Sequence, residues 1–258
     1  MLAVSLSVAL LNTVPPTTPI VCIPARLHSS RLPRKLLLAE SGQALLVHTC
    51  QAAAQAFGAQ AVLVAVDASE LGDVVTEAGF TAVMTSPDHQ SGTDRIAEAV
   101  RDRPGAIIVN VQGDEPEIDP RHIRRLAQLL DEHPWAGMAT LATPGDARDQ
   151  DDANAVKVVL GHDDRALWFS RAGVVFDREQ GCLMQQCFRH IGVYAYRREV
   201  LLGYRELPAS DLETLERLEQ LRAVQAGIGI ACAVVADAPA GIDCRADYEA
   251  FLRRRGMA

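Results

Sequence analysis

The stretch IVCIPARLHSSRLPRK, residues 20–35, joins a short apolar run to a strongly basic loop. Its first part, IVCIPA, predicts a buried β-strand, because the run is short, apolar and rich in β-branched residues. The cations of the loop are Arg26, Arg31, Arg34 and Lys35. No Asp or Glu precedes Glu40, although the formal net charge of the whole chain is −8. A cationic loop directly after a buried strand is typical of α/β proteins, which place ligands at the carboxyl ends of their strands.

The basic loop has two interpretations. Arg and Lys side chains at this edge of a sheet can hold a polyphosphate, Arg through paired hydrogen bonds and Lys as a point charge. The loop is not a P-loop, because it lacks the pattern G-x-x-x-x-G-K-[ST]. The alternative is a solvated basic loop that binds nothing, and the charge pattern alone fits both.

Strand and helix patterns alternate along both ends of the chain. AVLVAV (61–66) is a continuous apolar run, as expected for a parallel strand that is covered on both faces. Further strands are expected at 20–25, 81–85, 106–112 and 230–236, and helices at 42–57, 69–78, 93–101, 197–204, 211–226 and from about 244. This alternation predicts a doubly wound, mostly parallel, Rossmann-like α/β sheet.

The middle of the chain has a different pattern. Four strand-like runs, at 137–143, 155–160, 165–170 and 190–196, follow one another without helical patterns between them. They predict antiparallel additions to the sheet and a protruding lobe at about 138–196. We expect residues 1–19 to be a flexible leader and residues 20–258 to form a single domain.

Composition excludes several classes of function. An acidic chain of 258 residues is not expected to bind nucleic acid generally, because phosphate backbones require extended positive surface. The apolar run near the N-terminus is too short to span a bilayer and lacks the marks of a signal peptide, so no membrane association is expected. The six cysteines are scattered and contain no C-x-x-C pair, which predicts reduced thiols in the cytoplasm. No histidine pairs with them at zinc-ligand spacing, so no zinc site is predicted.

The segment VNVQGDEPEIDP (109–120) places an acid at the end of a predicted strand. Asp114 would then lie at the same sheet edge as the basic loop. A carboxylate that faces phosphates needs a bridging hard cation, and Mg²⁺ suits this position because it prefers carboxylate and phosphate oxygens. The alternative is an ordinary turn, because Gly, Asp and Pro are frequent turn residues.

Two further segments have a structural and a functional interpretation. Asp243, in AGIDCRADYEAF (240–251), is either the N-cap of the last helix or a second metal carboxylate. Ser91 and Thr93, in HQSGTDRIAEA (89–99), can cap a helix or present hydroxyl groups to a nucleobase.

The order of these motifs resembles one enzyme family. IPARLHSSRLPRK, HQSGTDRIAEAV, VNVQGDEPEID and GIDCRADYE are similar to segments of the 3-deoxy-manno-octulosonate (Kdo) cytidylyltransferases, also called CMP-Kdo synthetases. The resemblance continues through NAVKVVL, ALWFSRAGV, RHIGVYAYR and LETLERLEQLRAVQAG, and it covers about residues 20–253. It implies a nucleotidyltransferase fold with an antiparallel dimerisation lobe.

The resemblance also implies a role for each matching residue. It assigns nucleotide binding to Pro24, Ala25, Arg26, Arg31, Lys35, Ser91, Gly92, Thr93, Arg95 and Gln112. It assigns binding of the sugar acid to Gln112, Arg171, His190, Tyr194, Glu219 and Gln220. Mg²⁺ would be held by Asp114 and Asp243, which with Arg26, Arg31 and Lys35 form the catalytic set. Structural roles are the alternative for Tyr194 in the core, for Glu219 and Gln220 on an exposed helix, and for His190 as a satisfied histidine.

The chain departs from the family pattern at two places. Arg34 stands where a glycine is common, which puts the backbone shape of the basic loop in question. The last motif continues as Asp243-Cys244-Arg245-Ala246-Asp247, without the proline and one of the acids that are usual there.

The implied reaction is transfer of the cytidylyl group of CTP to Kdo for lipopolysaccharide synthesis, by a cytoplasmic, Mg²⁺-dependent homodimer. Alternatives are the same reaction with sialic acid, with 8-amino-Kdo or with another nonulosonate. A GT-A-like glycosyltransferase would usually carry a D-x-D motif, which QGDEP is not. A nucleotide-binding regulatory module would bind CTP without turnover.

Overall fold

The computed structural model describes residues 18–184, 186–238 and 241–257. Most of the predicted leader, residues 1–17, lies outside this part of the chain, and the division into a leader and a single domain stays a prediction. No helix of the described residues is long and apolar enough to cross a membrane.

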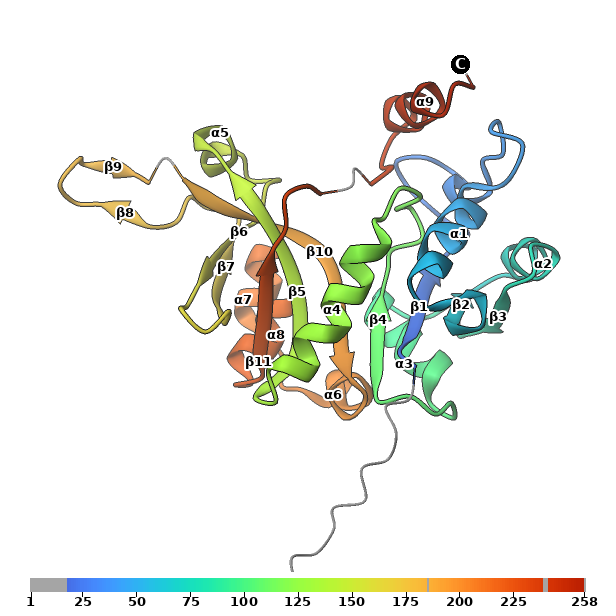
Figure 1. Cartoon of the computed structure of the whole chain (residues 1–258), viewed down its shortest axis with the longest axis horizontal. Helices are drawn as coiled ribbons and strands as arrows, with labels where there is room; N and C mark the ends of the chain where they lie inside the picture. The colour runs from blue at the N-terminus through green and yellow to red at the C-terminus, as the bar shows by residue number, and fades with distance from the viewer. Residues whose placement is uncertain (1–17, 185, 239–240, 258) are drawn as a thin grey trace, which may run out of the picture.

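A nine-stranded sheet forms the centre of the fold (Figure 1). Its main path, in spatial order, is β11 (Gly229–Val234), β5 (Ala136–Gly145), β10 (Cys187–Arg197), β4 (Ile107–Asn110), β1 (Ile20–Ala25), β2 (Val62–Val66) and β3 (Thr81–Met84). Neighbours along this path are parallel except at β10, which is antiparallel to both β4 and β5. The predicted doubly wound, mostly parallel sheet is therefore confirmed. The strand predicted at 137–143 belongs to the parallel set as β5 and is not an antiparallel addition.

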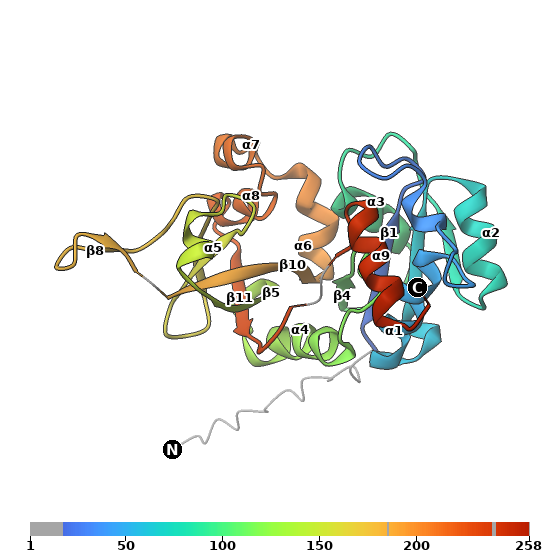
Figure 2. The same ribbon diagram turned by 90° about the horizontal axis from the view of Figure 1, so that it is seen from above.

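Helices cover both faces of the sheet (Figure 2). Buried side chains of α1 (Leu45–Phe57), α2 (Ser69–Glu77) and α4 (Pro120–Glu132) form one core with the strands. Those of α3 (Gly92–Val100), α6 (Arg198–Gly203) and α8 (Gln220–Gln225) form a second core on the other face. Strand β1 serves both cores, because Val21 and Ile23 point to the first and Cys22 to the second.

The sequence interpretation missed helix α4. Asp119 is its N-cap and accepts a hydrogen bond from the main-chain N of Arg121, and Pro120 occupies the first helical turn. These residues, followed by the buried Ile123 and Leu126, are a regular helix-start signal. The VNVQGDEPEIDP segment was interpreted only as a strand end and a turn, so its last two residues were not recognised as a cap.

The predicted lobe is built on the far end of β10. Strand β6 pairs antiparallel with β10 and with β7, and a hairpin of β8 and β9 projects from the sheet (Figure 1). The lobe elements are α5 (Ala147–Asp151), β6 (Lys157–Leu160), β7 (Ala166–Ser170), β8 (Phe176–Asp177) and β9 (Cys182–Leu183). Helix α5 was not predicted in this region. Its N-cap, Asp146, forms a reciprocal capping box with Asp149.

The helix predicted at 211–226 is two helices. α7 (Asp211–Glu216) ends at Arg217, which adopts a left-handed conformation with φ 52°, and α8 then begins at Gln220. This break places Glu219 and Gln220 at a corner between helices instead of on an exposed helix face. The chain ends with α9 (Arg245–Arg254), packed on α1, and short 3₁₀ turns occur at η1 (Lys35–Leu37), η2 (Ala59–Ala61) and η3 (Tyr204–Glu206).

Candidate active site

A pocket of about 400 Å³ lies at the carboxyl ends of β1 and β4. Polar side chains from four separate segments converge on it, as expected at this edge of an α/β sheet. Its lining includes Pro24, Ala25, Arg26, Arg31, Lys35, Ser91, Gly92, Arg95, Gln112, Asp114, Glu219 and Asp243. The predicted nucleotide-binding residues therefore come together, with the exception of Thr93, which is buried beside the pocket and donates to Glu219.

Lys35 links the two predicted metal carboxylates. Its Nζ donates to Asp114 Oδ2 at 2.5 Å and to the main-chain oxygen of Ile242 at 2.6 Å, and it lies 3.6 Å from Asp243 Oδ1. Arg31 reaches the same Asp243 oxygen at 2.8 Å. Both carboxylates thus converge on one cation, and their oxygens are the donor type that Mg²⁺ prefers. The arrangement fits a magnesium site shared with phosphate oxygens.

Asp243 does not cap the last helix. The N-cap of α9 is Cys244, and Asp247 accepts hydrogen bonds from the main-chain N atoms of Asp243 and Cys244. The capping interpretation of Asp243 was therefore wrong. Because Asp247 secures the helix start, the missing proline does not prevent Asp243 from facing the pocket.

Arg34 does not line the pocket. It forms an ion pair with Glu70 of α2 and adopts a left-handed backbone conformation, with φ 55° and ψ 29°. This conformation is the one for which glycine carries no steric cost. A glycine at this position would adopt the same conformation without strain, and the guanidinium of Arg34 is directed to Glu70 outside the pocket.

Replacing Arg34 with Gly is expected to leave the Michaelis constant for CTP within about twofold. The free energy of unfolding should rise by about 0–1 kcal/mol, because relief of the left-handed strain outweighs an exposed ion pair. Urea unfolding and steady-state kinetics measure both quantities, and Glu70→Gln isolates the contribution of the ion pair. A tenfold higher Michaelis constant for CTP would show instead that Arg34 contacts the nucleotide.

The segment at the start of α3 caps the helix through Ser91, and its contact with a nucleobase stays a prediction. Ser91 caps the helix by accepting from the main-chain N of Asp94, and it also lines the pocket together with Gly92. Gly92 lies close to Pro24, because a Cβ there would approach the Pro24 ring at 3.2 Å. Arg95 lines the pocket but is buried, and it donates to Thr85 Oγ1 at 2.8 Å. It therefore supports the pocket wall.

A second pocket of about 330 Å³ adjoins the first and shares Glu219 with it. Its lining residues come from β10, from the segment before β6 and from the corner between α7 and α8. They are Asn154, Ala155, Val156, Arg189, His190, Gly192, Tyr194, Arg217, Leu218, Glu219 and Gln220. Four of the predicted sugar-binding residues line this pocket, whereas Gln112 lines the first pocket.

Arg171 lies outside both pockets. Its guanidinium donates to the main-chain oxygens of Glu216 and Ala153, and its main-chain N donates to a Glu216 carboxylate oxygen. These bonds fix the turn before α8 against the lobe, so the side chain is positioned to support the second pocket. Its role in sugar binding stays a prediction.

The second pocket contains two arginines that the sequence interpretation did not select. Arg189 precedes His190 on β10, and Arg217 is the left-handed residue between α7 and α8. Both line the pocket, and together they provide positive charge for an anionic ligand. Arg189 is visible in the motif RHIGVYAYR, but Arg217 became recognisable only through the helix break.

His190 is half-buried and neutral. Its Nε2 lies 2.9 Å from Thr140 Oγ1, which in turn donates to the main-chain oxygen of Val193 at 2.8 Å. A hydroxyl has one proton, and Thr140 donates it to a main-chain oxygen, so His190 Nε2 carries the proton of the contact with Thr140 and Nδ1 is left as an acceptor. Burial lowers the pKa of His190 from 6.5 to about 3. The pairing of β10 with β5 shifts between Ile191 and Tyr194, as at a β-bulge, where such irregularities reorient side chains.

This low pKa predicts a loss of stability in weak acid. Below pH 6.5 the unfolded chain binds a proton at His190, whereas the folded chain does not do so until about pH 3. Between pH 7 and pH 5 the wild type should lose about 2 kcal/mol more unfolding free energy than His190→Gln. Urea unfolding of both proteins at the two pH values tests this, and parallel pH profiles would contradict a neutral His190.

Gln220 presents an unsatisfied donor to the second pocket. The side chain is buried, and its Nε2 has no hydrogen-bond partner among the described residues. Buried polar atoms are usually satisfied, so an orphan donor in a pocket wall indicates a ligand acceptor. Glu219, between the two pockets, accepts a hydrogen bond from Thr93, while burial raises the pKa of its carboxyl group.

Comparison with known proteins shows the family of the chain. The family model described as Cytidylyltransferase matches residues 20–230, so the chain belongs to the cytidylyltransferase family. Within this family its similarity is to 3-deoxy-manno-octulosonate cytidylyltransferases. The protein of that name from Rhodopirellula baltica is 48% identical, over 91% of this chain and 97% of the relative. The one from Thioalkalivibrio sulfidiphilus is 42% identical, over 89% of this chain and 95% of the relative.

Solved structures show the same relationship. A CMP:2-keto-3-deoxy-manno-octonic acid synthetase complexed with CTP matches with a TM-score of 0.87 and 38% identity, over 93% of this chain and 99% of that chain. A cytidylyltransferase from Leptospira borgpetersenii matches with a TM-score of 0.58 at 15% identity, which supports the fold alone. The first of these findings agrees with the resemblance that the sequence motifs indicated.

Proposed function

We propose that the protein transfers the cytidylyl group of CTP to the anomeric hydroxyl of Kdo and releases pyrophosphate. The observation that carries the proposal is the pair of adjoining pockets that share Glu219. One contains the cations and carboxylates suited to a metal-bound triphosphate, and the other contains two arginines, a neutral histidine and an unsatisfied amide. The family relationship with the Kdo enzymes supports the same assignment.

The basic loop would bind the triphosphate of CTP. Arg26, Arg31 and Lys35 line one side of the pocket, where their charges oppose the negative charge that develops on phosphate oxygens during transfer. Ser91 and Gly92 line the same pocket and would bind the cytosine. Bound triphosphate would give Arg31 and Lys35 an alternative to their present pairing with Asp243 and Asp114.

Asp114 and Asp243 would hold Mg²⁺, because their oxygens converge on one position and fit its ligand preference. When bound, the ion supplies positive charge to the phosphate oxygens. The protein's own contribution is to orient both substrates, so that the C2 hydroxyl of Kdo approaches the α-phosphorus opposite the leaving pyrophosphate. No side chain is assigned as a general base.

The second pocket would bind the sugar acid. Arg189 and Arg217 offer charge to its carboxylate, and Gln220 offers the unpartnered Nε2 donor. The neutral His190, with Nε2 engaged by Thr140, can accept a hydrogen bond from a sugar hydroxyl through Nδ1. Glu219 lies where the two substrates would meet.

The direct test measures pyrophosphate release with CTP, Mg²⁺ and Kdo, in parallel with sialic acid and 8-amino-Kdo. We expect release with Kdo that requires Mg²⁺. Release only with another sugar acid would keep the reaction and change the substrate. A folded protein that binds CTP without releasing pyrophosphate with any of the three would contradict the proposal.

We also propose a cytoplasmic homodimer that serves lipopolysaccharide synthesis. All six cysteines are free thiols, which suits a reducing compartment. Large apolar side chains of the lobe are exposed, namely Leu167, Val175, Phe176, Met184 and Phe188. Such a surface is typical of an interface between copies of a chain.

Replacing Phe176 with Glu is expected to convert a dimer into a monomer in light scattering after size-exclusion chromatography. Phe176 is the most exposed member of this apolar group, at 64%, so a charge there would be buried in the interface but tolerated in the monomer. Leu215→Glu, on exposed α7, is the matched control. A wild-type monomer would contradict the dimer proposal.

A further inference from the structure

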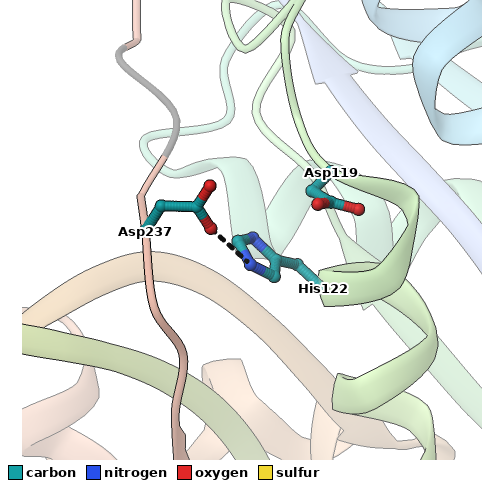
Figure 3. A group of neighbouring side chains, drawn as sticks. All are labelled: Asp119, His122 and Asp237. Atoms are coloured by element: carbon teal, nitrogen blue, oxygen red, sulfur yellow. Dashed lines mark ion pairs between the residues drawn. The ribbon is translucent and has the colours of Figure 1, made fainter.

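Three side chains with metal-binding chemistry lie together outside both pockets of the candidate active site. They are Asp119, His122 and Asp237, and one possible ligand atom from each lies within 4.8 Å of the other two (Figure 3). Asp119 and His122 belong to the first turn of α4, and Asp237 follows strand β11. A cluster of carboxylates is not a site by itself, so the histidine is the decisive member.

His122 is buried without the partners that a buried imidazole needs. The residue is 5% exposed, and its Nδ1 has no hydrogen-bond partner among the described residues. Its Nε2 lies 3.5 Å from Asp237 Oδ1, which is longer than a normal hydrogen bond. Neither ring nitrogen of His122 therefore has a normal hydrogen bond among the described residues. An unpartnered buried side chain costs free energy, so Nε2, the nitrogen that faces Asp237, is available to a ligand (Figure 3).

The two carboxylates retain capacity for a ligand. Asp119 Oδ1 accepts from the main-chain N of Arg121, whereas the Arg121 side chain bonds to Oδ2, so Oδ1 keeps a free lone pair. The side chain of Asp237 is 73% exposed and can move without repacking the core. All three residues line a pocket of about 450 Å³, which gives room for solvent ligands.

We propose that Asp119, His122 and Asp237 bind one divalent transition-metal ion of the Zn²⁺ type, with water completing the coordination. One imidazole nitrogen and two carboxylate oxygens are a common protein ligand set for such ions, whereas Mg²⁺ takes oxygen ligands. Ligands at zinc distances in a tetrahedron are separated by about 3.4 Å. His122 Nε2 lies 3.5 Å from Asp237 Oδ1, which fits this value, so Nε2 is the ligand atom of the imidazole. A small shift of the Asp119 and Asp237 carboxylates would bring their oxygens to the same spacing.

The ion would connect two segments that lead to the candidate active site. Asp119 follows Asp114 in the connection between β4 and α4, and Asp237 precedes Asp243 in the connection between β11 and α9. A metal at this position would stabilise both connections. The prediction of no zinc site rested on the spacing of cysteines and histidines, and a site made of one histidine and distant carboxylates has no such spacing.

Equilibrium dialysis of the full-length protein against Zn²⁺, in excess Mg²⁺, tests the proposal. We expect a single ion per chain, bound at least about tenfold more weakly by Asp237→Asn and by His122→Asn. His133→Asn is the matched control. His133 Nε2 lies 3.5 Å from Asp164 Oδ2, so this histidine also neighbours a carboxylate but has only that one beside it. Asp237 is exposed, so its variant is expected to fold, and circular dichroism confirms this for every protein.

Co²⁺ as a substitute probe separates this site from the cysteines. Bound Co²⁺ should show visible absorption without a thiolate charge-transfer band, and Asp237→Asn should lose this absorption. A thiolate band would place the ion at a cysteine such as the exposed Cys244 and overturn the proposal. Equal Zn²⁺ affinity in wild type, Asp237→Asn and His122→Asn would also overturn it.

Discussion

Replacing Asp114 with Asn is expected to reduce pyrophosphate release from CTP and Kdo by at least about 100-fold in kcat. The substitution removes a negative charge from the place where two carboxylates converge on the Nζ of Lys35. An amide oxygen is a weaker ligand for Mg²⁺ than a carboxylate, so charge on the phosphate oxygens would be less well neutralised. Steady-state kinetics at saturating CTP and varied Mg²⁺ measure the loss, which excess Mg²⁺ should reverse only in part.

Asp131→Asn is the matched control for this experiment. Asp131 lies on the exposed face of α4, and the same chemical change there should leave kcat within about twofold. Thermal unfolding of both variants shows whether the fold is retained. If Asp114→Asn kept more than a tenth of the wild-type rate, Asp114 would not be a metal ligand and the turn interpretation of QGDEP would be sufficient.

Replacing Lys35 with Met is expected to lower kcat/KM for CTP by about 100- to 1,000-fold. Met matches the length and shape of the buried stem but removes the ammonium group that meets Asp114, Asp243 and the main-chain oxygen of Ile242. Because both carboxylates are partly exposed to water, the loss of unfolding free energy in the absence of metal should be only about 1–2 kcal/mol.

A second measurement on the same variant distinguishes binding of the metal from binding of the phosphates. Without the ammonium group only Arg31, which pairs with Asp243, still competes for the two carboxylates. Mg²⁺ alone should therefore raise the melting temperature of Lys35→Met more than that of the wild type. Arg34→Met controls for loss of a neighbouring cation outside the pocket. Equal Mg²⁺-induced shifts in both variants would mean that Lys35 does not hold the position of the metal.

The sequence motifs predicted most of the nucleotide pocket because its residues lie within short, continuous segments. Arg26, Arg31 and Lys35 occur in one loop, and Ser91 and Gly92 in another. Each segment follows a strand of the parallel set, so strand order alone brings these segments to the same sheet edge. Thr93 was the exception, because whether a hydroxyl faces the pocket or the core depends on the rotation of α3.

The sugar pocket was less predictable because its walls depend on irregular backbone. Arg217 itself adopts the left-handed conformation between α7 and α8 and lines the pocket. No helical pattern in the sequence indicates such a break. Arg171 was selected from a motif, but its guanidinium donates to main-chain oxygens of neighbouring segments. The charge of an arginine is evident from sequence, whereas its partner depends on which carbonyl groups lie within reach.

By itself the sequence determined the alternation of strands and helices, the cationic loop after the first strand and the acids at the ends of later ones, because these follow from local hydrophobic periodicity and residue type. Only the tertiary structure decided which charges meet. Lys35 pairs with Asp114, 79 residues away, and with the main chain of Ile242, 207 residues away. His122, in α4, likewise lies near Asp237, which follows β11, only because the fold brings these two distant segments together. Such contacts depend on the packing of whole elements, and no local pattern contains that information.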